Sequence, residues 1–161
     1  MGNVAPSIVA DLMSRNVVTL DVEQDLALAE EILKLAHCRH LPVVQEGRLV
    51  GLVTHRDLLR VLAETTASFS TEENEWFGRQ RVKRTIRAGD VMTQGVTTVS
   101  PDTPLTAAVE LMRQNNFGCL PVVERGDLVG ILTEWDLVDW AGKALEEKRA
   151  SSPAGDPSPA I

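Results

Sequence analysis

The sequence predicts an α+β fold in which one strand-helix-strand-strand-helix unit occurs twice. The chain repeats itself at a constant offset of 79 residues, so that Leu41-Pro42-Val43-Val44 returns as Leu120-Pro121-Val122-Val123. In each copy, short β-branched runs alternate with apolar residues at helical spacing. Each copy has roughly 50 residues, which is near the lower limit for a core that is stable by itself. We therefore expect the two copies to fold together as one unit.

The first strand and the first helix of the unit are clearest in the second copy. Val96–Val99 is short and β-branched, which predicts a strand. Thr103 is a good N-cap and Pro104 suits the first helical position, so a helix should begin there. Apolar residues then follow at the spacing of a core-facing helix: Leu105, Ala108, Val109 and Met112, matched in the first copy by Leu26, Ala29 and Leu33.

A β-hairpin and a closing helix complete each copy. In the second copy, the apolar runs 120–123 and 128–132 flank a glycine-containing turn, and the first copy repeats this at 41–44 and 49–53. Proline cannot donate to a sheet ladder, so Pro42 and Pro121 should begin a strand or lie on an edge. The closing helices carry apolar residues: Leu58, Leu59, Val61 and Leu62, and Leu137, Val138, Ala141 and Leu145.

The flanking segments divide the chain further. We assign 1–10 to an N-terminal arm, 11–63 to the first repeat and 90–148 to the second. The linker 64–89 is too long for a plain connection. It contains an expected loop at Ser68–Thr71 and an expected helix over 73–85. The tail 149–161 is small, polar and rich in proline, which predicts disorder.

Composition excludes several classes of protein. The net charge of −7 argues against a nucleic-acid partner, and the basic run Arg79–Arg87 is balanced by acidic residues just before it. No apolar stretch approaches the roughly 20 residues of a membrane span, and no signal peptide is recognisable. Cys38 and Cys119 are not at equivalent repeat positions. Two unmatched cysteines indicate reduced thiols and a cytoplasmic location.

A motif of glycine, two apolar residues, threonine, two variable residues and aspartate occurs at 51–57 and again at 130–136. Thr54 with Asp57, and Thr133 with Asp136, can form a capping box at a helix start. The same helix start can bind a ligand, because its free amides attract phosphate and a carboxylate can accept hydrogen bonds from sugar hydroxyls. The motif glycines fit either close approach of a ligand or simple packing.

The repeated unit, the Leu-Pro-Val-Val strand and the Thr-x-x-Asp motif together resemble the CBS (cystathionine-β-synthase-type) domain, over about residues 8–145. The resemblance implies a tandem CBS pair, or Bateman module, in which two β-α-β-β-α repeats pack with pseudo-twofold symmetry. It further implies clefts that bind adenosine-containing ligands such as AMP, ADP, ATP or S-adenosylmethionine. It also implies a homodimer that regulates an attached or partner protein.

The resemblance assigns site residues by position. Asp57 and Asp136 match the family's ribose-binding acid, and Thr54 and Thr133 match its ribose or phosphate hydroxyl. The segments expected to line the adenine are Val17, Val18 and Thr19; Val96, Thr97 and Thr98; Leu41 and Pro42; and Leu120 and Pro121. The remaining expected contacts precede the Leu-Pro pair or lie inside the Thr-x-x-Asp motif: Arg39, His40, His55 and Arg56, with Cys119 and Trp135 in the second copy.

The two copies differ in charge at these positions. The basic residues Arg39, His40, His55 and Arg56 are replaced in the second copy by Gly118, Cys119, Glu134 and Trp135. We therefore expect unequal pockets. One pocket should be lined by the four basic residues and accept polyphosphates, and the other pocket, which contains Glu134, should repel phosphate.

Other interpretations of the same residues carry less weight. Trp135 fits either stacking on an adenine or packing on a neighbour. His37, Cys38, His40 and His55 match no zinc spacing, and Cys119 lacks an evident base. The sequence thus predicts a non-catalytic regulatory module without a catalytic cofactor or metal, signalling to an unknown effector protein in trans. The alternative is a structural or dimerisation module without a tight small-molecule ligand, in which both motifs serve only as caps.

Overall fold

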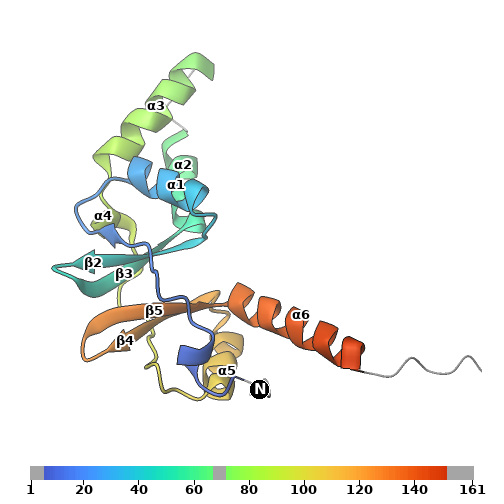
Figure 1. Ribbon diagram of the computed structural model, residues 1–161. Coiled ribbons are helices and arrows are strands. Elements are labelled where there is room, and N and C mark those ends of the chain that lie inside the picture. Colours follow the sequence, from blue (N-terminus) through green and yellow to red (C-terminus); the bar gives the residue numbers. More distant parts are fainter. Residues whose placement is uncertain (1–5, 67–71, 152–161) are drawn as a thin grey trace, which may run out of the picture.

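The computed structural model describes residues 6–66 and 72–151, and it has the expected architecture of two similar halves (Figure 1). The expected loop at 68–71, the first five residues of the arm and residues 152–161 of the tail lie outside the described residues. The first half contains β1 (Leu20–Asp21), α1 (Leu26–Leu35), β2 (His40–Gln45), β3 (Arg48–Thr54) and α2 (His55–Thr66). The second contains α5 (Leu105–Asn115), β4 (Cys119–Glu124), β5 (Asp127–Thr133) and α6 (Glu134–Ser151).

The two hairpins meet at the centre of the molecule, with helices above and below them (Figure 1). β1 pairs in parallel with β2, which pairs antiparallel with β3, and β4 pairs antiparallel with β5. Each hairpin has a bulge at the same repeat position, between Val43 and Val44 and between Val122 and Val123. The repeat in sequence is therefore a repeat in structure.

The expectation for proline is wrong at Pro42, which lies inside β2, the middle strand of its sheet. Pro42 pairs with Leu52, and the Leu52 N–H and C=O are bonded on the opposite side to Thr93, at 3.0 and 2.9 Å. Because Leu52 needs no donor from β2, the missing proline N–H costs nothing there.

The strand expected at Val96–Val99 is reduced to a single parallel bridge between Val99 and Val122. In the first half, the equivalent strand is extended by a hydrogen bond of 3.0 Å from the Val22 N–H to the Val44 carbonyl. The repeat places Pro101 at the position of Val22. Proline has no N–H, so the ladder ends one bond earlier in the second half.

The segment around the start of each repeat crosses to the opposite half. Val9, which begins a short 3₁₀ helix (Val9–Asp11), and Met13, which follows that helix, are buried in the second core. Ala88, in the short helix α4 (Ala88–Val91), is buried in the first core. Backbone bonds of about 3 Å join Ser14 to Ile131 in the same way that they join Thr93 to Leu52. The two halves are therefore interlocked.

The crossing segments also begin the helices. The Leu105 N–H donates to the Ser7 carbonyl at 2.9 Å, and the Leu26 N–H donates to the Ile86 carbonyl at 3.1 Å. The expected cap by Thr103 is wrong, because α5 begins at Leu105 without a side-chain cap bond. The Thr103 hydroxyl instead accepts from the Ser100 N–H at 3.1 Å.

Residues that both repeats share serve this interlocking. The Asp11 carboxylate accepts the Ser7 N–H at 2.8 Å, and Asp90 accepts the Arg87 N–H at 2.9 Å, each closing a short turn. A Cβ on Gly130 would lie 2.6 Å from the Met13 sulfur, and one on Gly51 would overlap Met92. The motif glycines are thus explained by packing against the crossing segments.

Two further helices complete the structure. α3 (Glu72–Thr85) packs beside α1, and its buried Lys83 pairs with Glu30. Burial by itself raises the pKa of Glu30, but hydrogen bonds from Lys83 and Lys34 lower it below the ordinary value. α6 continues through residues 149–151, which the sequence assigns to the tail, because Glu146–Ala150 are strong helix formers. Within the described ranges, no helix is both long and apolar enough to cross a lipid bilayer.

Candidate functional site

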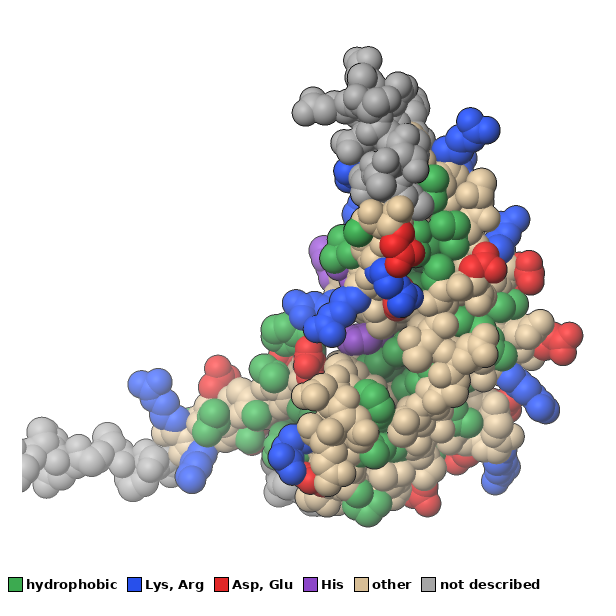
Figure 2. Space-filling model, turned by 180° about the vertical axis from the view of Figure 1, so that it is seen from behind, with side chains coloured by type: hydrophobic (Ala, Val, Ile, Leu, Met, Phe, Trp, Pro, Cys, Tyr) green, Lys and Arg blue, Asp and Glu red, His purple; other side chains and the backbone are tan. Residues whose placement is uncertain are grey.

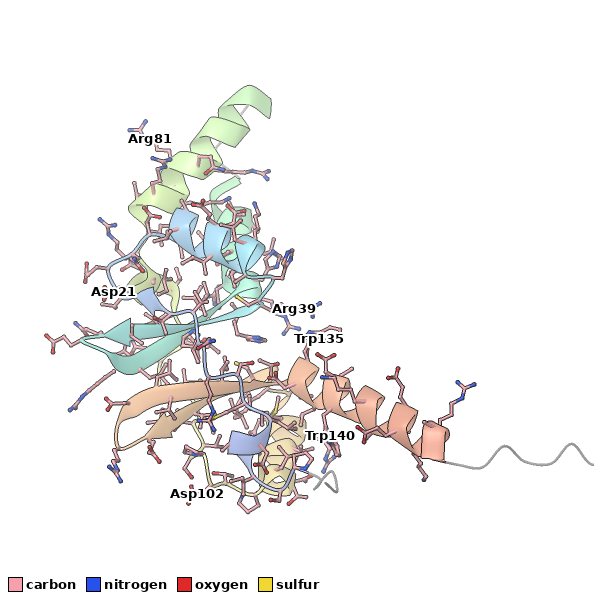
Figure 3. The ribbon with its side chains drawn as sticks, in the orientation of Figure 1. Asp21, Arg39, Arg81, Asp102, Trp135 and Trp140 are labelled. Carbon is pink, nitrogen blue, oxygen red and sulfur yellow. The ribbon has the colours of Figure 1, made fainter. Side chains whose placement is uncertain are left out.

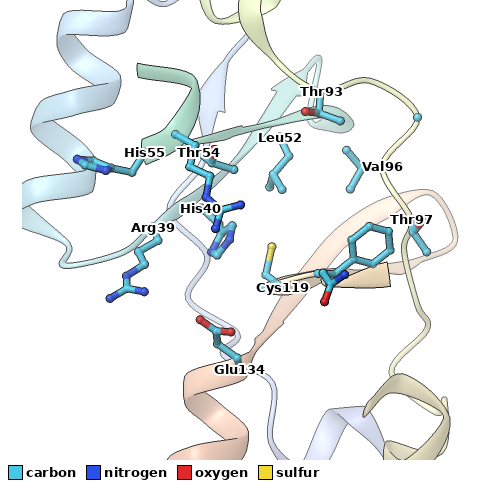
Figure 4. Close-up of a pocket in the computed structure, with 15 residues that line it drawn as sticks. Arg39, His40, Leu52, Thr54, His55, Thr93, Val96, Thr97, Cys119 and Glu134 are labelled. Atoms are coloured by element: carbon cyan, nitrogen blue, oxygen red, sulfur yellow. The ribbon is translucent and has the colours of Figure 1, made fainter. Parts of the chain in front are cut away.

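A cleft of about 570 Å³ lies between the two halves (Figure 4). Its lining combines the starts of β2 and α2 from the first repeat with the segments before β4 and α6 from the second. It is also bordered by the chain that follows α4. The lining residues are Arg39, His40, Leu52, Thr54, His55, Arg56, Thr93, Gly95, Val96, Thr97, Asn116, Phe117, Gly118, Cys119 and Glu134.

The cleft has two chemically different ends. Leu52 and Val96 lie at one end, with Thr93 and Thr97 beside them, whereas Arg39 and His55 lie at the other (Figure 4). On the surface, histidine, basic and acidic side chains gather at the junction of the two halves, near the base of α6 (Figure 2). Such a cleft suits a ligand with a flat apolar part and a charged part.

The charged side chains that line the cleft do not neutralise one another. Within residues 6–66 and 72–151, the side chains of His40, His55, Arg56 and Glu134 make no hydrogen bond or ion pair. The Arg39 guanidinium lies 5.6 Å from the centre of the Trp135 ring. These two side chains point toward one another from the residue before β2 and from the first turn of α6 (Figure 3). The contact is a cation–π interaction.

His40 lies where the two repeats touch. A Cβ on Gly118 would come within 2.8 Å of the His40 ring, so the ring occupies space that only glycine leaves open. Burial lowers the pKa of His40, and the nearby Arg39 and Arg56 lower it further, while Glu134 acts in the opposite direction. His40 is therefore mainly neutral at pH 7.

Cys119 occupies the repeat position of His40 and is buried at the floor of the cleft. Burial, with Glu134 nearby, raises the pKa of its thiol to about 12. A thiol with such a pKa is almost wholly protonated at pH 7 and is a poor nucleophile.

Both Thr-x-x-Asp motifs form capping boxes. The Asp57 Oδ2 accepts the Thr54 N–H at 2.8 Å and its hydroxyl at 2.7 Å, while the Asp57 N–H points to the Thr54 hydroxyl at 3.4 Å. Asp136 and Thr133 repeat this arrangement with the carboxylate distances at 2.7 and 2.6 Å. The second oxygen, Oδ1, pairs with Arg60 at 3.1 Å in the first copy and accepts from Ser14 at 3.4 Å in the second.

The structure brings some of the expected site residues together and places others elsewhere. Eight of them line the cleft: Arg39, His40, Thr54, His55, Arg56, Val96, Thr97 and Cys119. Asp57 lies directly behind Thr54 but outside the lining. Others are fully buried in the two cores: Leu41, Pro42, Leu120 and Pro121. The rest lie outside this cleft, mostly at the symmetry-related position: Val17, Val18, Thr19, Thr98, Thr133, Trp135 and Asp136.

Sequence reasoning missed several lining residues. Leu52 and Thr93 line the cleft beside their shared backbone bonds. Asn116, Phe117 and Gly118 occupy the repeat positions of His37, Cys38 and Arg39. That correspondence was a usable signal, because a pseudo-twofold axis places the two pre-strand segments opposite each other.

The expected separation of charge between two pockets is wrong. Glu134 lines the same cleft as Arg39, His40, His55 and Arg56. The physical reason is that α6 begins opposite β2, where the Glu134 N–H donates to the Gly118 carbonyl at 3.1 Å. Its counterpart, the His55 N–H, donates to the Arg39 carbonyl at 3.2 Å. Residues at equivalent repeat positions therefore face each other across one cleft.

The histidines and cysteines of the first repeat do not gather. Among the described residues, no group of three or more His, Cys, Asp or Glu side chains is placed to hold a metal ion.

Comparison with known proteins gives a consistent result. The sequence profile of the CBS domain matches residues 9–64 and 88–143. A CBS domain-containing protein of Dictyostelium discoideum is 35% identical over 141 residues, covering 86% of this chain and 94% of that protein.

Two solved structures are similar along most of their length. The structure of CBSX2 in complex with AMP has a TM-score of 0.70 and 28% identity, covering 86% of this chain and 98% of that one. The CBS domain pair of protein MJ0100, in complex with 5′-methylthioadenosine and S-adenosyl-L-methionine, has a TM-score of 0.69 and 28% identity. It covers 86% of this chain and 99% of that one.

Proposed function

Because this chain belongs to the CBS domain family, we propose that it is a non-catalytic regulatory module whose inter-repeat cleft binds an adenosine-containing ligand. The observation that carries the proposal is the two-ended cleft, whose cationic side chains are available to a ligand. Its volume lies within the range of roughly 300–1,000 Å³ that is usual for small-molecule sites.

The similar structures support the adenosine part of the ligand. CBSX2 was solved with AMP, and the MJ0100 pair with 5′-methylthioadenosine and S-adenosyl-L-methionine. The three ligands share adenosine and differ in the group on its 5′ carbon. Apolar side chains that could hold an adenine lie at one end of the cleft, namely Leu52 and Val96, and hydroxyl groups that could bind the sugar are present in the lining at Thr54 and Thr97.

In the proposed complex, the adenine lies against Leu52 and Val96, and the 5′ substituent reaches Arg39, His55 and Arg56. The Asp57 Oδ2 keeps its bonds to Thr54, while Oδ1 leaves Arg60 and accepts from a ribose hydroxyl. The Arg60 side chain of this pair is 58% exposed and the pair is therefore weak, so this exchange costs little. We propose the equivalent use of Thr133 and Asp136 for a second ligand at the symmetry-related position.

The ligand would regulate by touching both repeats. A ligand shifts a conformational equilibrium only through different affinities for the two states. A cleft lined by β2, α2 and the start of α6 allows this, because a change in packing of the halves changes the contacts. We further propose that the chain acts in the cytoplasm, as a homodimer, on an effector protein in trans.

Two arginines provide the test. In the double variant Arg39→Gln/Arg56→Gln, the affinity for AMP should fall about a hundredfold or more, because two hydrogen bonds to charged groups, at about 1.5–3 kcal/mol each, are removed. Isothermal titration calorimetry measures this directly. The control is Arg48→Gln, which removes a positive charge at the far end of β3, outside the cleft. If Arg48→Gln weakens AMP as much as the double variant does, the assignment of the phosphate end is wrong.

A second candidate function has its own support. Both Thr-x-x-Asp motifs are already engaged in helix capping, which is all that a purely structural or interaction module would require of them. Under that alternative, AMP, ADP, ATP and S-adenosylmethionine would all leave the melting temperature of the wild-type protein unchanged.

A further inference from the structure

The start of α6 brings an acidic side chain to the basic end of the cleft. Of the described residues that line the cleft, Glu134 alone is acidic. Its carboxylate faces His40 and Arg39 (Figure 4). Its backbone is fixed by the bond from its N–H to the Gly118 carbonyl, so the side chain projects from a defined point.

Among the described residues, the Glu134 carboxylate has no partner of opposite charge, yet it acts on other groups in the cleft. Within residues 6–66 and 72–151, its carboxylate makes no hydrogen bond or ion pair, although Arg39 and Arg56 line the same cleft. Its electrostatic influence nevertheless reaches the interior of the site. Burial lowers the pKa of His40 and Glu134 offsets part of this, whereas burial raises the pKa of Cys119 and Glu134 adds to the increase. A ligand placed among these side chains will therefore experience its negative charge.

We propose that Glu134 is a specificity-determining residue that limits the negative charge of the bound ligand, so that the cleft prefers an adenosine ligand with one phosphate over a triphosphate. This inference rests on the proposed function and revises the expectation of a polyphosphate pocket. A cleft without Glu134 would accept longer phosphate chains.

The balance of charge supports the preference. The cleft offers the guanidiniums of Arg39 and Arg56 against one carboxylate, and Arg39 is shared with the Trp135 ring. His40 adds little positive charge at pH 7, because burial lowers its pKa. One phosphate carries a charge of about −1.5 to −2, which two arginines can match. Two further phosphates would exceed the available positive charge and would lie beside Glu134.

The test compares AMP and ATP on the wild-type protein, on Glu134→Gln and on the matched control Glu124→Gln. Glu124 ends β4 at the hairpin turn, so its variant changes the net charge equally but leaves the cleft intact. Isothermal titration calorimetry of the full chain should show tighter binding of AMP than of ATP to the wild type. Glu134→Gln should tighten ATP by about tenfold and AMP by less than about threefold. Glu124→Gln should leave both affinities within about twofold of wild type.

Salt provides a second readout. The increase in ATP affinity caused by Glu134→Gln should become smaller between low salt and 1 M salt, where charges are screened beyond about 3 Å. The inference is overturned if the ratio of AMP to ATP affinity is the same in Glu134→Gln as in the wild type. It is also overturned if the variant weakens both nucleotides, which would make Glu134 a direct ligand contact. If the wild type binds neither nucleotide, this inference fails, and the proposed function fails with it only if ADP and S-adenosylmethionine also do not bind. A titration with these two ligands therefore distinguishes the two failures.

Discussion

At the scale of single residues, differences between the repeats are complementary in space. Gly118 and Cys119 occupy the repeat positions of Arg39 and His40. They do more than remove two basic side chains, because the segments before β2 and β4 face each other. His40 packs where Gly118 has no side chain, and its pseudo-symmetric partner Cys119 is small. A large pair on one repeat thus requires a small pair on the other.

A double-mutant cycle tests this complementarity. Gly118→Ala should lower the free energy of unfolding by about 1–2 kcal/mol, because its Cβ would lie 2.8 Å from the His40 ring. In the His40→Ala background, the same change should be neutral or slightly stabilising, since alanine reduces the entropy of the unfolded chain. Urea denaturation gives all four values. Equal losses in both backgrounds would show that His40 is not the obstacle.

At the scale of elements, the strands accept unusual residues because of the crossing segments. Pro42 is tolerated in a central strand because Leu52 bonds to Thr93 instead. Gly130 is needed because Met13 and the Ser14 carbonyl lie against β5. The repeated Gly-apolar-apolar-Thr motif is therefore partly explained by the crossing segment that packs against each strand.

Alanine substitution of one glycine in β5 and one in α6 compares a closely packed position with an open one. Gly130→Ala should cost about 2–3 kcal/mol of stability, because its Cβ would lie 2.6 Å from the Met13 sulfur and 3.2 Å from the Ser14 carbonyl oxygen. Met13→Ala should restore only part of this, because the backbone oxygen remains. The control is Gly142→Ala. A Cβ on Gly142 would meet no atom within 4 Å, and Gly142 lies inside α6, so this substitution should raise the free energy of unfolding by about 0.5–1 kcal/mol. Thermal unfolding that ranked these variants in the opposite order would refute the packing argument.

At the scale of the whole molecule, the two halves cannot be separated without exposing both cores. Val9 and Met13 precede β1 of the first half in sequence but belong to the second core, and Ala88 precedes α5 of the second half but belongs to the first core. Because the contributions are reciprocal, we expect the chain to unfold as one cooperative unit. That cooperativity is also what would let a ligand in the cleft influence both halves.

Val9→Ala tests the cooperativity. Val9 is fully buried in the second core, so its truncation should cost about 2 kcal/mol. Hydrogen exchange should then show the same loss of protection in the slowest amides of β2–β3 as in those of β4–β5. If protection fell in the second hairpin alone, the halves would unfold independently and the interlocked core would not act as one unit.

The sequence alone determined the repeated unit, the hairpins, the helix starts at Thr54 and Thr133, and the family. It could do so because apolar periodicity, turn residues and capping pairs are local signals. It also identified eight of the residues that line the cleft, chiefly those beside the Leu-Pro and Thr-x-x-Asp motifs.

The tertiary structure alone decided which residues share the cleft. Sequence comparison pairs Glu134 with His55 as equivalents and therefore assigns them to different pockets. The pseudo-twofold arrangement instead brings equivalent positions face to face, so the carboxylate of one repeat lies among the basic side chains of the other. Likewise, only packing shows that the arm and the linker exchange cores. Local sequence patterns indicate the secondary structure that each segment prefers, whereas the charge of a cleft depends on which distant segments meet there.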